Sequence, residues 1–402
     1  MSRSVAVEKF LGYVKINSQS NENTHVTPST KCQYDMQTQL MKELDEIKTP
    51  YVFEKENCIL KVDMPSTNGS TKSIGFFAHI DTSPEASGEH VEPIIHRLPN
   101  QVTSDLTLPK NNTVIDKADI EKYAGDEIIT SSGDTLLGAD DKSGVAILMG
   151  TIHSIVTQNI PHPRLLFVFT PDEEIGESCD HVVVDDLHLD CAYCIDGDEL
   201  GTYCEDGFNA FEATLKIDGH EVHPGEAFGV MEDAGYILSQ FYTSLPMSRR
   251  PETTRENQGY ILCTSMSGAV MHSEARFIVR SFEVAEMEMF IQLMKDQCEV
   301  LRQRYKKSTI TIEFREQYRN MKRYLPGDLL SQKLVEAMKH VGVEPVKIYM
   351  RGGADCSHLS AHGLPCINMF AGGKNFHSRR EFVPIKAIDK GVEVVLKLVT
   401  LF

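Results

Sequence analysis

Three short apolar runs in the first half of the chain each end at a histidine or at acidic residues. The runs cover residues 74–78, 165–170 and 192–195, and the polar residues that follow them are His79, Glu173-Glu174 and Asp196. Runs this uniformly apolar predict strands that are buried on both faces of a mainly parallel sheet. Because ligands of such sheets bind at the carboxyl ends of the strands, we expect these polar side chains to lie together.

A helix is predicted between the first and second of these strands. It follows the segment Gly138–Gly144 and carries apolar residues at helical spacing, namely Val145, Leu148, Met149, Ile152 and Val156. This spacing predicts an amphipathic helix with Asp140 at its start. Asp140 or Asp141 then has two interpretations, an N-cap, which is a common use of aspartate, or a ligand beside the other polar residues.

The pattern changes near Asp206-Gly207, where the buried runs give way to alternating ones. From there the chain predicts a strand, a helix, two strands, a helix and a strand, at residues 209–217, 226–242, 260–264, 276–282, 284–305 and 308–314. This βαββαβ order is that of a ferredoxin-like fold. The predicted architecture is therefore an α/β domain with a mainly parallel sheet and a second, α+β domain.

Length and composition agree with two soluble domains. A chain of 402 residues is too long for one compact core, and 41% hydrophobic with 24% charged residues is ordinary for a globular protein. The N-terminus lacks the apolar core of a signal peptide, and no segment approaches the roughly 18 apolar residues of a membrane span. We therefore expect a cytoplasmic protein that does not bind membranes.

Charge and cysteine usage argue against two further classes. The formal charge of -18 argues against nucleic acid as a partner, since phosphate binding requires basic patches. The 10 cysteines occur without a secretory context, so we expect reduced thiols rather than disulfides. Cys191 and Cys194 have the spacing of a redox or zinc motif, but they lie in a predicted buried strand, where buried thiols are favoured.

The polar clusters have the chemistry of a metal site. Two histidines far apart in the sequence bracket the acidic clusters, and the whole set is His79, Asp140-Asp141, Glu173-Glu174, Asp196 and His377. Imidazole and carboxylate ligands suit a pair of divalent ions such as Zn²⁺ better than a thiolate site would. Two imidazoles and three carboxylates shared by two ions require one carboxylate to bridge, and such a pair activates water for hydrolysis.

Eight short motifs occur in a fixed order over nearly the whole chain. They are His79–Thr82, Gly138–Gly144, Thr170–Gly176, Asp196–Gly201, His223–Gly225, Arg351–Asp355, Gly372–His377 and Glu381–Pro384. In this order they resemble the tripeptide aminopeptidases of the M20 family of dizinc metallopeptidases, whereas any single motif is weak. The chain departs from the family pattern at Cys356-Ser357-His358 and at Ser378, so the resemblance leaves the side-chain preference open.

The resemblance implies a role for each ligand of the cluster. His79 and Asp196 would hold one zinc, Glu174 and His377 would hold the other, and Asp140 would bridge them. Two Zn²⁺ ions per subunit are implied, with Co²⁺ or Mn²⁺ as substitutes.

Two further residues near these ligands are implied to take part in the reaction. Glu173 would be the general base that takes the proton of the bridging water. Asp81 would orient the imidazole of His79, because i and i+2 side chains of an extended segment share a face.

The resemblance also implies how the domains divide. Residues 1–206 and 320–402 would form the catalytic domain, and residues 207–319 would form an inserted lid and dimerisation domain, with a homodimer through the insertion. His223 in the insertion would stabilise the oxyanion of the tetrahedral intermediate. Its other interpretation is a turn histidine fixed by Pro224-Gly225.

Three residues are candidates for binding a substrate. Arg280 and Arg351 have the side chain suited to bidentate binding of a C-terminal carboxylate, and Asn209 is a weaker candidate near the start of the insertion. An arginine at a strand end is as often a solvated residue or an ion-pair partner.

Three functions are compatible with the sequence. The first is a dizinc aminopeptidase that removes the N-terminal residue from tripeptides. The second is an N-acyl amino acid deacylase or dipeptidase with the same metal site, and a requirement for a free α-amine separates it from the first. The third is a non-enzymatic metal-binding or scaffold protein, against which the retention of Glu173 with every ligand argues.

Overall fold

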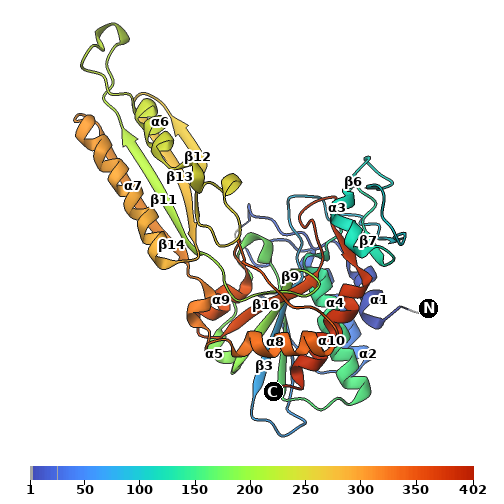
Figure 1. Ribbon diagram of the computed structural model, residues 1–402. Coiled ribbons are helices and arrows are strands. Elements are labelled where there is room, and N and C mark those ends of the chain that lie inside the picture. Colours follow the sequence, from blue (N-terminus) through green and yellow to red (C-terminus); the bar gives the residue numbers. More distant parts are fainter. Residues whose placement is uncertain (1–2, 25) are drawn as a thin grey trace. The chain divides into compact units, whose positions relative to one another are not determined.

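The computed structural model describes residues 3–24 and 26–402, and the chain divides into two compact units (Figure 1). Unit 1 comprises Met1–Glu205, Tyr324–Ile348 and Ala354–Phe402, and unit 2 comprises Asp206–Arg323 and Tyr349–Gly353. Each unit buries a hydrophobic cluster of its own. The chain therefore enters unit 2 twice, the second time for the short segment Tyr349–Gly353.

Unit 1 is built around an eight-stranded sheet with the order β1-β2-β8-β3-β9-β16-β10-β15. Its strands, in that order, are Val52–Glu54, Ile59–Met64, Arg164–Thr170, Ser73–His79, Cys191–Glu199, Cys366–Gly372, Thr202–Cys204 and Val346–Lys347. The four central strands β8, β3, β9 and β16 run parallel to one another. This confirms the predicted mainly parallel sheet and the α/β fold class.

The central strands are apolar along their whole length because both of their faces are buried. All residues of β3 and β8 after the first are buried, so no alternation of polar and apolar residues survives. Helix α4 (Ala139–Gln158) packs on β3, β9 and β16, and it also contacts α1 (Val5–Tyr13) and α10 (Ile385–Val399). The expectation of an amphipathic helix was wrong here, because residues 141–152 of α4 are buried on every side.

Shorter elements complete unit 1. The remaining helices are α2 (Gln33–Glu46), α3 (Lys117–Ile120), α5 (Val184–Leu187), α8 (Leu329–His340) and α9 (Asp355–Ala361). A three-stranded sheet contains β17 (Phe382–Pro384), β7 (Glu127–Thr130) and β4 (Ile94–Arg97), and a two-stranded one contains β5 (Leu106–Thr107) and β6 (Val114–Ile115). The first of these sheets brings the C-terminal motif at Glu381–Pro384 beside the segment that leads into α4.

Unit 2 has the predicted βαββαβ order. It contains β11 (Asn209–Asp218), α6 (Ala234–Ser244), β12 (Tyr260–Gly268), β13 (His272–Ser281), α7 (Val284–Arg304) and β14 (Thr309–Tyr318). The sheet order is β12-β13-β11-β14 and every pairing is antiparallel. This confirms the ferredoxin-like α+β fold of the inserted segment.

Four elements of unit 2 have boundaries that differ from those predicted, and one residue of α7 is more exposed than expected. Helix α6 begins at Ala234 rather than at Glu226, because Asp233 caps it by accepting from the backbone N–H of Gly235 at 2.8 Å. Strands β12, β13 and β14 are longer than predicted, because most of their added residues are polar or small and carry no apolar pattern. Val284, expected on the buried face of α7, is 42% exposed as the first residue of the helix.

Two features bear on the expected protein class. No disulfide joins the cysteines of the described residues, and Cys191 and Cys194 are buried as expected. Burial raises the pKa of the Cys191 thiol to about 12, which keeps it protonated. Within residues 3–24 and 26–402, no helix is both long and apolar enough to cross a membrane.

Candidate metal centre and active site

The polar residues at the strand ends of unit 1 converge, as the sequence predicted. His79 is the last residue of β3, and β8 ends at Thr170, after which Glu173–Ile175 form a 3-10 turn. Asp140 precedes the regular part of α4, since Asp140 and Asp141 have non-helical backbone angles. Of the two aspartates, Asp141 makes the capping contact, because its Oδ1 accepts from Gly144 N–H at 3.1 Å, whereas Asp140 faces the histidines.

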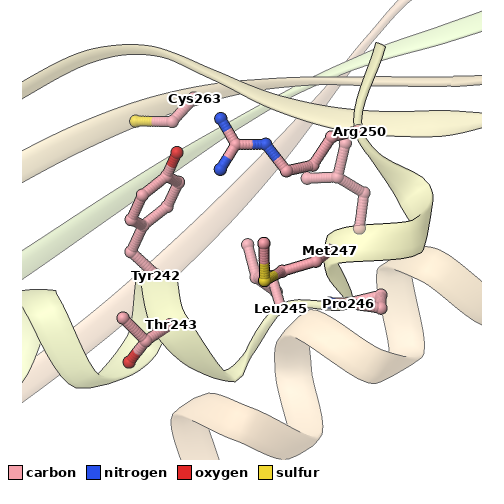
Figure 2. A pocket seen from close by; sticks show the side chains of 8 residues that line it. Tyr242, Thr243, Leu245, Pro246, Met247, Arg250 and Cys263 are labelled. Atoms are coloured by element: carbon pink, nitrogen blue, oxygen red, sulfur yellow. The ribbon is translucent and has the colours of Figure 1, made fainter. Parts of the chain in front are cut away.

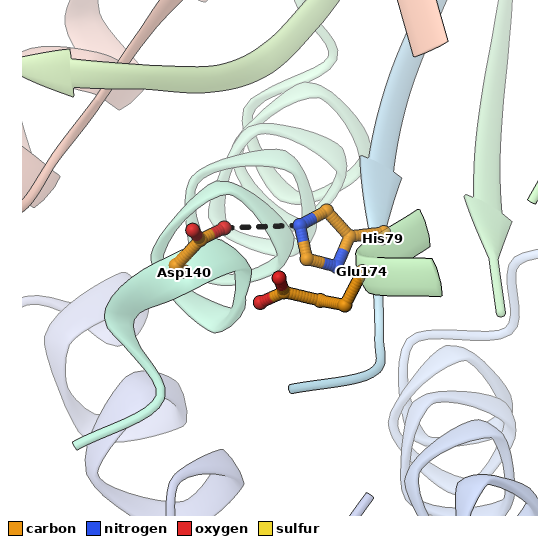
Figure 3. A group of neighbouring side chains, drawn as sticks. All are labelled: His79, Asp140 and Glu174. Atoms are coloured by element: carbon orange, nitrogen blue, oxygen red, sulfur yellow. Dashed lines mark hydrogen bonds and ion pairs between the residues drawn. The ribbon is translucent and has the colours of Figure 1, made fainter. Parts of the chain in front are cut away.

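Asp140 lies between the two histidines and offers each of them a different oxygen. Its Oδ1 is 3.0 Å from Nε2 of His79, and its Oδ2 is 3.2 Å from Nε2 of His377. Figure 3 shows the contact with His79 and the carboxylate of Glu174 beside it. A carboxylate placed this way can bridge two ions.

One further carboxylate accompanies each histidine. Nε2 of His377 lies 2.8 Å from Oε2 of Glu174, and Nε2 of His79 lies 3.5 Å from Oδ1 of Asp196. Oε2 of Glu173 is 3.9 Å from the same atom of His79. Two groups of three residues each bring their ligand atoms within 4.8 Å of one another. One group is His79, Asp140 and Glu174, and the other is His79, Glu173 and Asp196.

Asp81 holds the turn that carries both glutamates. Its two oxygens accept from the backbone N–H of Glu173 at 3.0 Å and of Glu174 at 3.2 Å. Oδ1 of Asp81 is also 3.2 Å from Nδ1 of His79, although the angle falls outside hydrogen-bond geometry. Asp81 therefore lies beside the imidazole of His79 and ties β3 to the turn after β8, and its role in orienting the imidazole stays a prediction.

Asp196 lies at a β-bulge rather than after the end of its strand. Strand β9 continues to Glu199, and its register against β16 shifts by one residue between Cys194 and Gly197. Asn368 of β16 braces this bulge, because its side chain accepts from Asp196 N–H at 3.1 Å and donates to Asp196 C=O at 3.0 Å. The predicted strand end at Ile195 was wrong, since a bulge re-aims a side chain without ending the strand.

Glu381 supports the loop before Asp140, a contact that the sequence analysis did not identify. Its carboxylate is buried and accepts from three backbone N–H groups, those of Leu137 and Gly138 at 2.7 Å and that of Asp140 at 3.0 Å. It therefore fixes the loop that presents Asp140. Its motif was recognised, but the sequence alone did not indicate what the carboxylate contacts.

The charges of the cluster are unbalanced in favour of the carboxylates. Burial raises the pKa of Glu174 to about 8 and that of Asp196 to about 7, and it also raises the pKa of Glu173. Hydrogen bonds to Asp140 and Glu174 raise the pKa of His377 to about 11. The raised pKa values favour the neutral form of these three carboxyl groups as long as no cation accompanies them.

The donor set fits divalent cations. Oε1 of Glu174 is buried and has no hydrogen-bond partner within the described part of the chain, which is costly for a carboxylate oxygen unless a cation accompanies it. Imidazole nitrogens and carboxylate oxygens are the ligands that zinc and similar ions take in catalytic sites.

The predicted residues of the insertion lie in unit 2, where their polar groups make local contacts. Nδ1 of the exposed His223 accepts from Gly225 N–H at 3.1 Å, which is the contact of a turn histidine. Asn209 is buried, donates to the carbonyls of Ser281 and Phe282 and accepts from Asn320 N–H.

The two arginines are also engaged within unit 2. Arg280 donates to the carbonyls of Phe211 and Val279 and to Gln317 Oε1. The Arg351 guanidinium lies over the rings of both Phe208 and Tyr260, 5.5 and 5.4 Å from their centres. Its donors reach three acceptors, namely Glu256 O, Gln258 O and Thr254 Oγ1. These contacts hold each arginine in place, and the role of either residue toward a substrate stays a prediction.

Unit 2 also contains a small hollow of about 160 Å³ between residues 242–250 and residues 261–263 (Figure 2). Arg250 is the charged residue of its lining, and Nε of Arg250 lies 2.5 Å from Glu252. No carboxylate or histidine is among the lining residues, so the chemistry of the metal cluster is absent from this hollow.

Comparisons with known proteins agree with the motifs. The model of peptidase family M20/M25/M40 matches residues 135–401. A protein named peptidase T from Caldanaerobacter subterraneus subsp. tengcongensis is 37% identical, over 99% of this chain and 99% of that relative.

Solved structures share the fold. An aminopeptidase PepT from Bacillus cereus has a TM-score of 0.79 at 20% identity, covering 98% of this chain and 97% of that one. The YXEP protein of Bacillus subtilis, described as a dinuclear metal-binding peptidase, has a TM-score of 0.69 at 13% identity, covering 98% and 97%. The family model and the 37% identical relative each match most of the sequence, and on that ground this chain belongs to peptidase family M20/M25/M40.

Proposed function

We propose that the chain is a metal-dependent aminopeptidase that releases the N-terminal residue of tripeptides in the cytoplasm, with two Zn²⁺ ions as its resident metals. Family membership and relatives named peptidase T, matched over nearly the whole chain, support this activity. The single observation that carries the proposal is the placement of Asp140, which faces His79 with one oxygen and His377 with the other.

The ligands divide into two sets around Asp140. His79 and Asp196 would hold one ion, Glu174 and His377 would hold the other, and Asp140 would contribute an oxygen to each. The contacts of 3.5 Å and 2.8 Å within the two sets support this division. The unpartnered Oε1 of Glu174 supports a cation at that position. Co²⁺ or Mn²⁺ would fit the same nitrogen and oxygen ligands.

The remaining residues of the cluster would position groups and move protons. Divalent ions bound there supply Lewis acidity toward a water molecule and toward the carbonyl oxygen of the scissile amide. Glu173 accepts a proton from the attacking water at a carboxylate oxygen and delivers it to the leaving amine. Asp81 keeps Glu173 and Glu174 in place through their backbone N–H groups.

Unit 2 would contribute substrate recognition. His223 is the candidate for stabilising the oxyanion, and Arg280, Arg351 and Asn209 are the candidates for holding the C-terminal carboxylate. We include in the proposal that residues 207–319 form a lid that also joins two subunits into a homodimer.

The test is release of the N-terminal residue from a simple tripeptide such as Met-Gly-Gly. The matching dipeptide and the N-acetylated tripeptide are assayed beside it, before and after chelation and after restoration of zinc. Cleavage of the free tripeptide alone, lost on chelation and regained with zinc, is the expected result. Cleavage of the acetylated peptide would instead assign the chain to the deacylases.

A further inference from the structure

The turn that carries Glu173 is preceded by Asp172, a buried carboxylate with no part in the proposed chemistry. Asp172 has a left-handed backbone (φ 60°, ψ 27°), and Gly176 after the turn is also left-handed at φ 77°. The turn is only three residues long, from Glu173 to Ile175. The direction in which Glu173 points therefore depends on how firmly Asp172 is held.

Asp172 is held by the segment before helix α2 and by the first residue of that helix. Its Oδ2 accepts from Ser29 N–H at 2.8 Å, and its Oδ1 accepts from Ser29 Oγ at 2.5 Å and from Gln33 Nε2 at 2.6 Å. The backbone N–H of Asp172 donates back to Gln33 Oε1 at 3.2 Å. All three side chains are at most 5% exposed. Gln33, which is remote in sequence, thus forms hydrogen bonds with both the side chain and the backbone of Asp172.

We propose that Asp172, clamped by Ser29 and Gln33, is the positioning residue that fixes Glu173 for proton transfer. This inference rests on the proposed function of Glu173. Asp81 holds the backbone N–H of Glu173 from the side of β3, and the Asp172 clamp holds the preceding residue from the side of α2. The Asp81 contact and the Asp172 clamp together hold the turn in one orientation. Glu173 is therefore already positioned before the reaction, and no entropy is lost in ordering it during the reaction.

The amide and the carboxylate of the clamp can be exchanged, which gives a sharp test. In D172N the new amide loses a contact in either orientation, because its Nδ2 meets the donor Gln33 Nε2 in the Oδ1 position and the donor Ser29 N–H in the Oδ2 position. In Q33E two carboxylates meet across the 2.6 Å contact.

The double variant D172N/Q33E restores the complementarity. Asn at position 172 donates from Nδ2 to Glu at position 33, which also accepts from the backbone N–H of residue 172. The Ser29 hydroxyl, 3.3 Å from the position 33 nitrogen, can rotate and donate to the new carboxylate. Net charge is the same as in the wild type.

The experiment measures kcat, KM, bound metal and backbone hydrogen exchange of residues 171–177 for the wild type and the three variants. Outer contacts of this kind are worth about 10- to 100-fold in activity. We expect kcat to fall by about that factor in each single variant and to recover in the double variant, with KM and bound metal unchanged. Backbone hydrogen exchange of residues 171–177 should be faster in the single variants and return to the wild-type rate in the double variant.

The controls are D35N, at an exposed site on α2, and Q332E, at an exposed site on α8, which repeat the chemical changes elsewhere in unit 1. If Q33E does not fold, the single variants S29A and D172N test the inference through backbone hydrogen exchange of residues 171–177. Single variants with wild-type kcat and exchange would overturn the inference, as would a folded double variant that stays impaired. A wild type that cleaves no tripeptide would overturn only the proposed function, because hydrogen exchange is measured without substrate.

Discussion

The two histidines of the candidate metal centre lie in very different surroundings. The His79 side chain is 1% exposed at the end of a central strand, whereas the His377 side chain is 37% exposed on a loop. His79 contacts Asp81, Asp140 and Asp196, all within unit 1. His377 shares Asp140 and Glu174 and also faces the exposed Glu85, 3.4 Å from its Nδ1.

The candidate metal centre thus has two halves, one around His79 and one around His377, and different forces hold them in place. The His79 half depends on a sheet whose strands are buried on both faces and on hydrogen bonds to backbone groups. The His377 loop is closed by backbone hydrogen bonds between Lys374 and Phe382, and it is tied by ion pairs from Lys374 to Asp119 and Glu199. Ion pairs between partly exposed side chains are weaker than buried packing, so the His377 half should be the more easily perturbed one.

The largest effect is expected from the base in the His79 half. Glu173→Gln removes the proton acceptor while keeping the side chain's size, and general-base groups contribute about 10²- to 10⁴-fold. We expect kcat to fall by that factor with both metals retained, as measured by steady-state assays and metal analysis. Glu177→Gln, just beyond the turn, is the matched control and should keep wild-type activity. An active E173Q enzyme would assign the base to another residue.

Removing each histidine compares the two halves directly. His79 belongs to both sets of neighbouring ligand atoms, so His79→Ala should lower the bound metal below one equivalent per chain. His377→Ala leaves His79, Asp140, Glu173 and Asp196 together and should retain about one of the two proposed equivalents. Metal analysis after gel filtration measures both values. Equal retention by the two variants would show that the halves do not differ.

The parts of the site that follow from strand ends could be predicted from the sequence. His79 comes directly after an apolar run and Glu173 lies shortly after another, and parallel strands bring their carboxyl ends to one edge. Two histidines among acidic clusters then indicate a metal pair. The βαββαβ order of unit 2 was likewise visible, because its helices and its buried strand positions keep regular periods.

The contacts that hold these residues could not be predicted, since they join segments far apart in sequence. Glu381 reaches the loop before Asp140, and Gln33 reaches Asp172, without any local pattern that indicates the pairing. The bulge at Asp196 depends on the register of β16, which the sequence of β9 does not contain. Strand β14 was predicted too short because its outer residues are exposed and polar.

Removing the side chain of Asn368, which braces the bulge at Asp196, should show how the His79 half responds to lost hydrogen bonds. Asn368→Ala leaves the N–H and C=O of Asp196 without their partner in a buried strand, which should lower the free energy of unfolding by about 2 kcal/mol. Urea denaturation measures this loss, and the exposed Asn257→Ala serves as the control. Metal affinity should fall with it, since Asp196 is a proposed ligand. Unchanged stability would mean that water replaces the amide of Asn368.

The smallest effect is expected from the ion pairs of the exposed half. Lys374→Met removes the contacts of 3.1 Å to Asp119 and 3.0 Å to Glu199 but leaves the backbone pair with Phe382 intact. Ion pairs that solvent reaches contribute about 0.2–1 kcal/mol, so the affinity for one of the two metals should fall by only a few-fold. Salt screens such pairs, and the difference between the variant and the wild type should shrink between low and high ionic strength. Competition with a weak chelator measures the affinity, and Lys72→Met, which removes the exposed pair with Asp190, is the matched control. A salt-independent loss for Lys374→Met would mean that the loop is held by packing, and the two halves would then be stabilised in the same way.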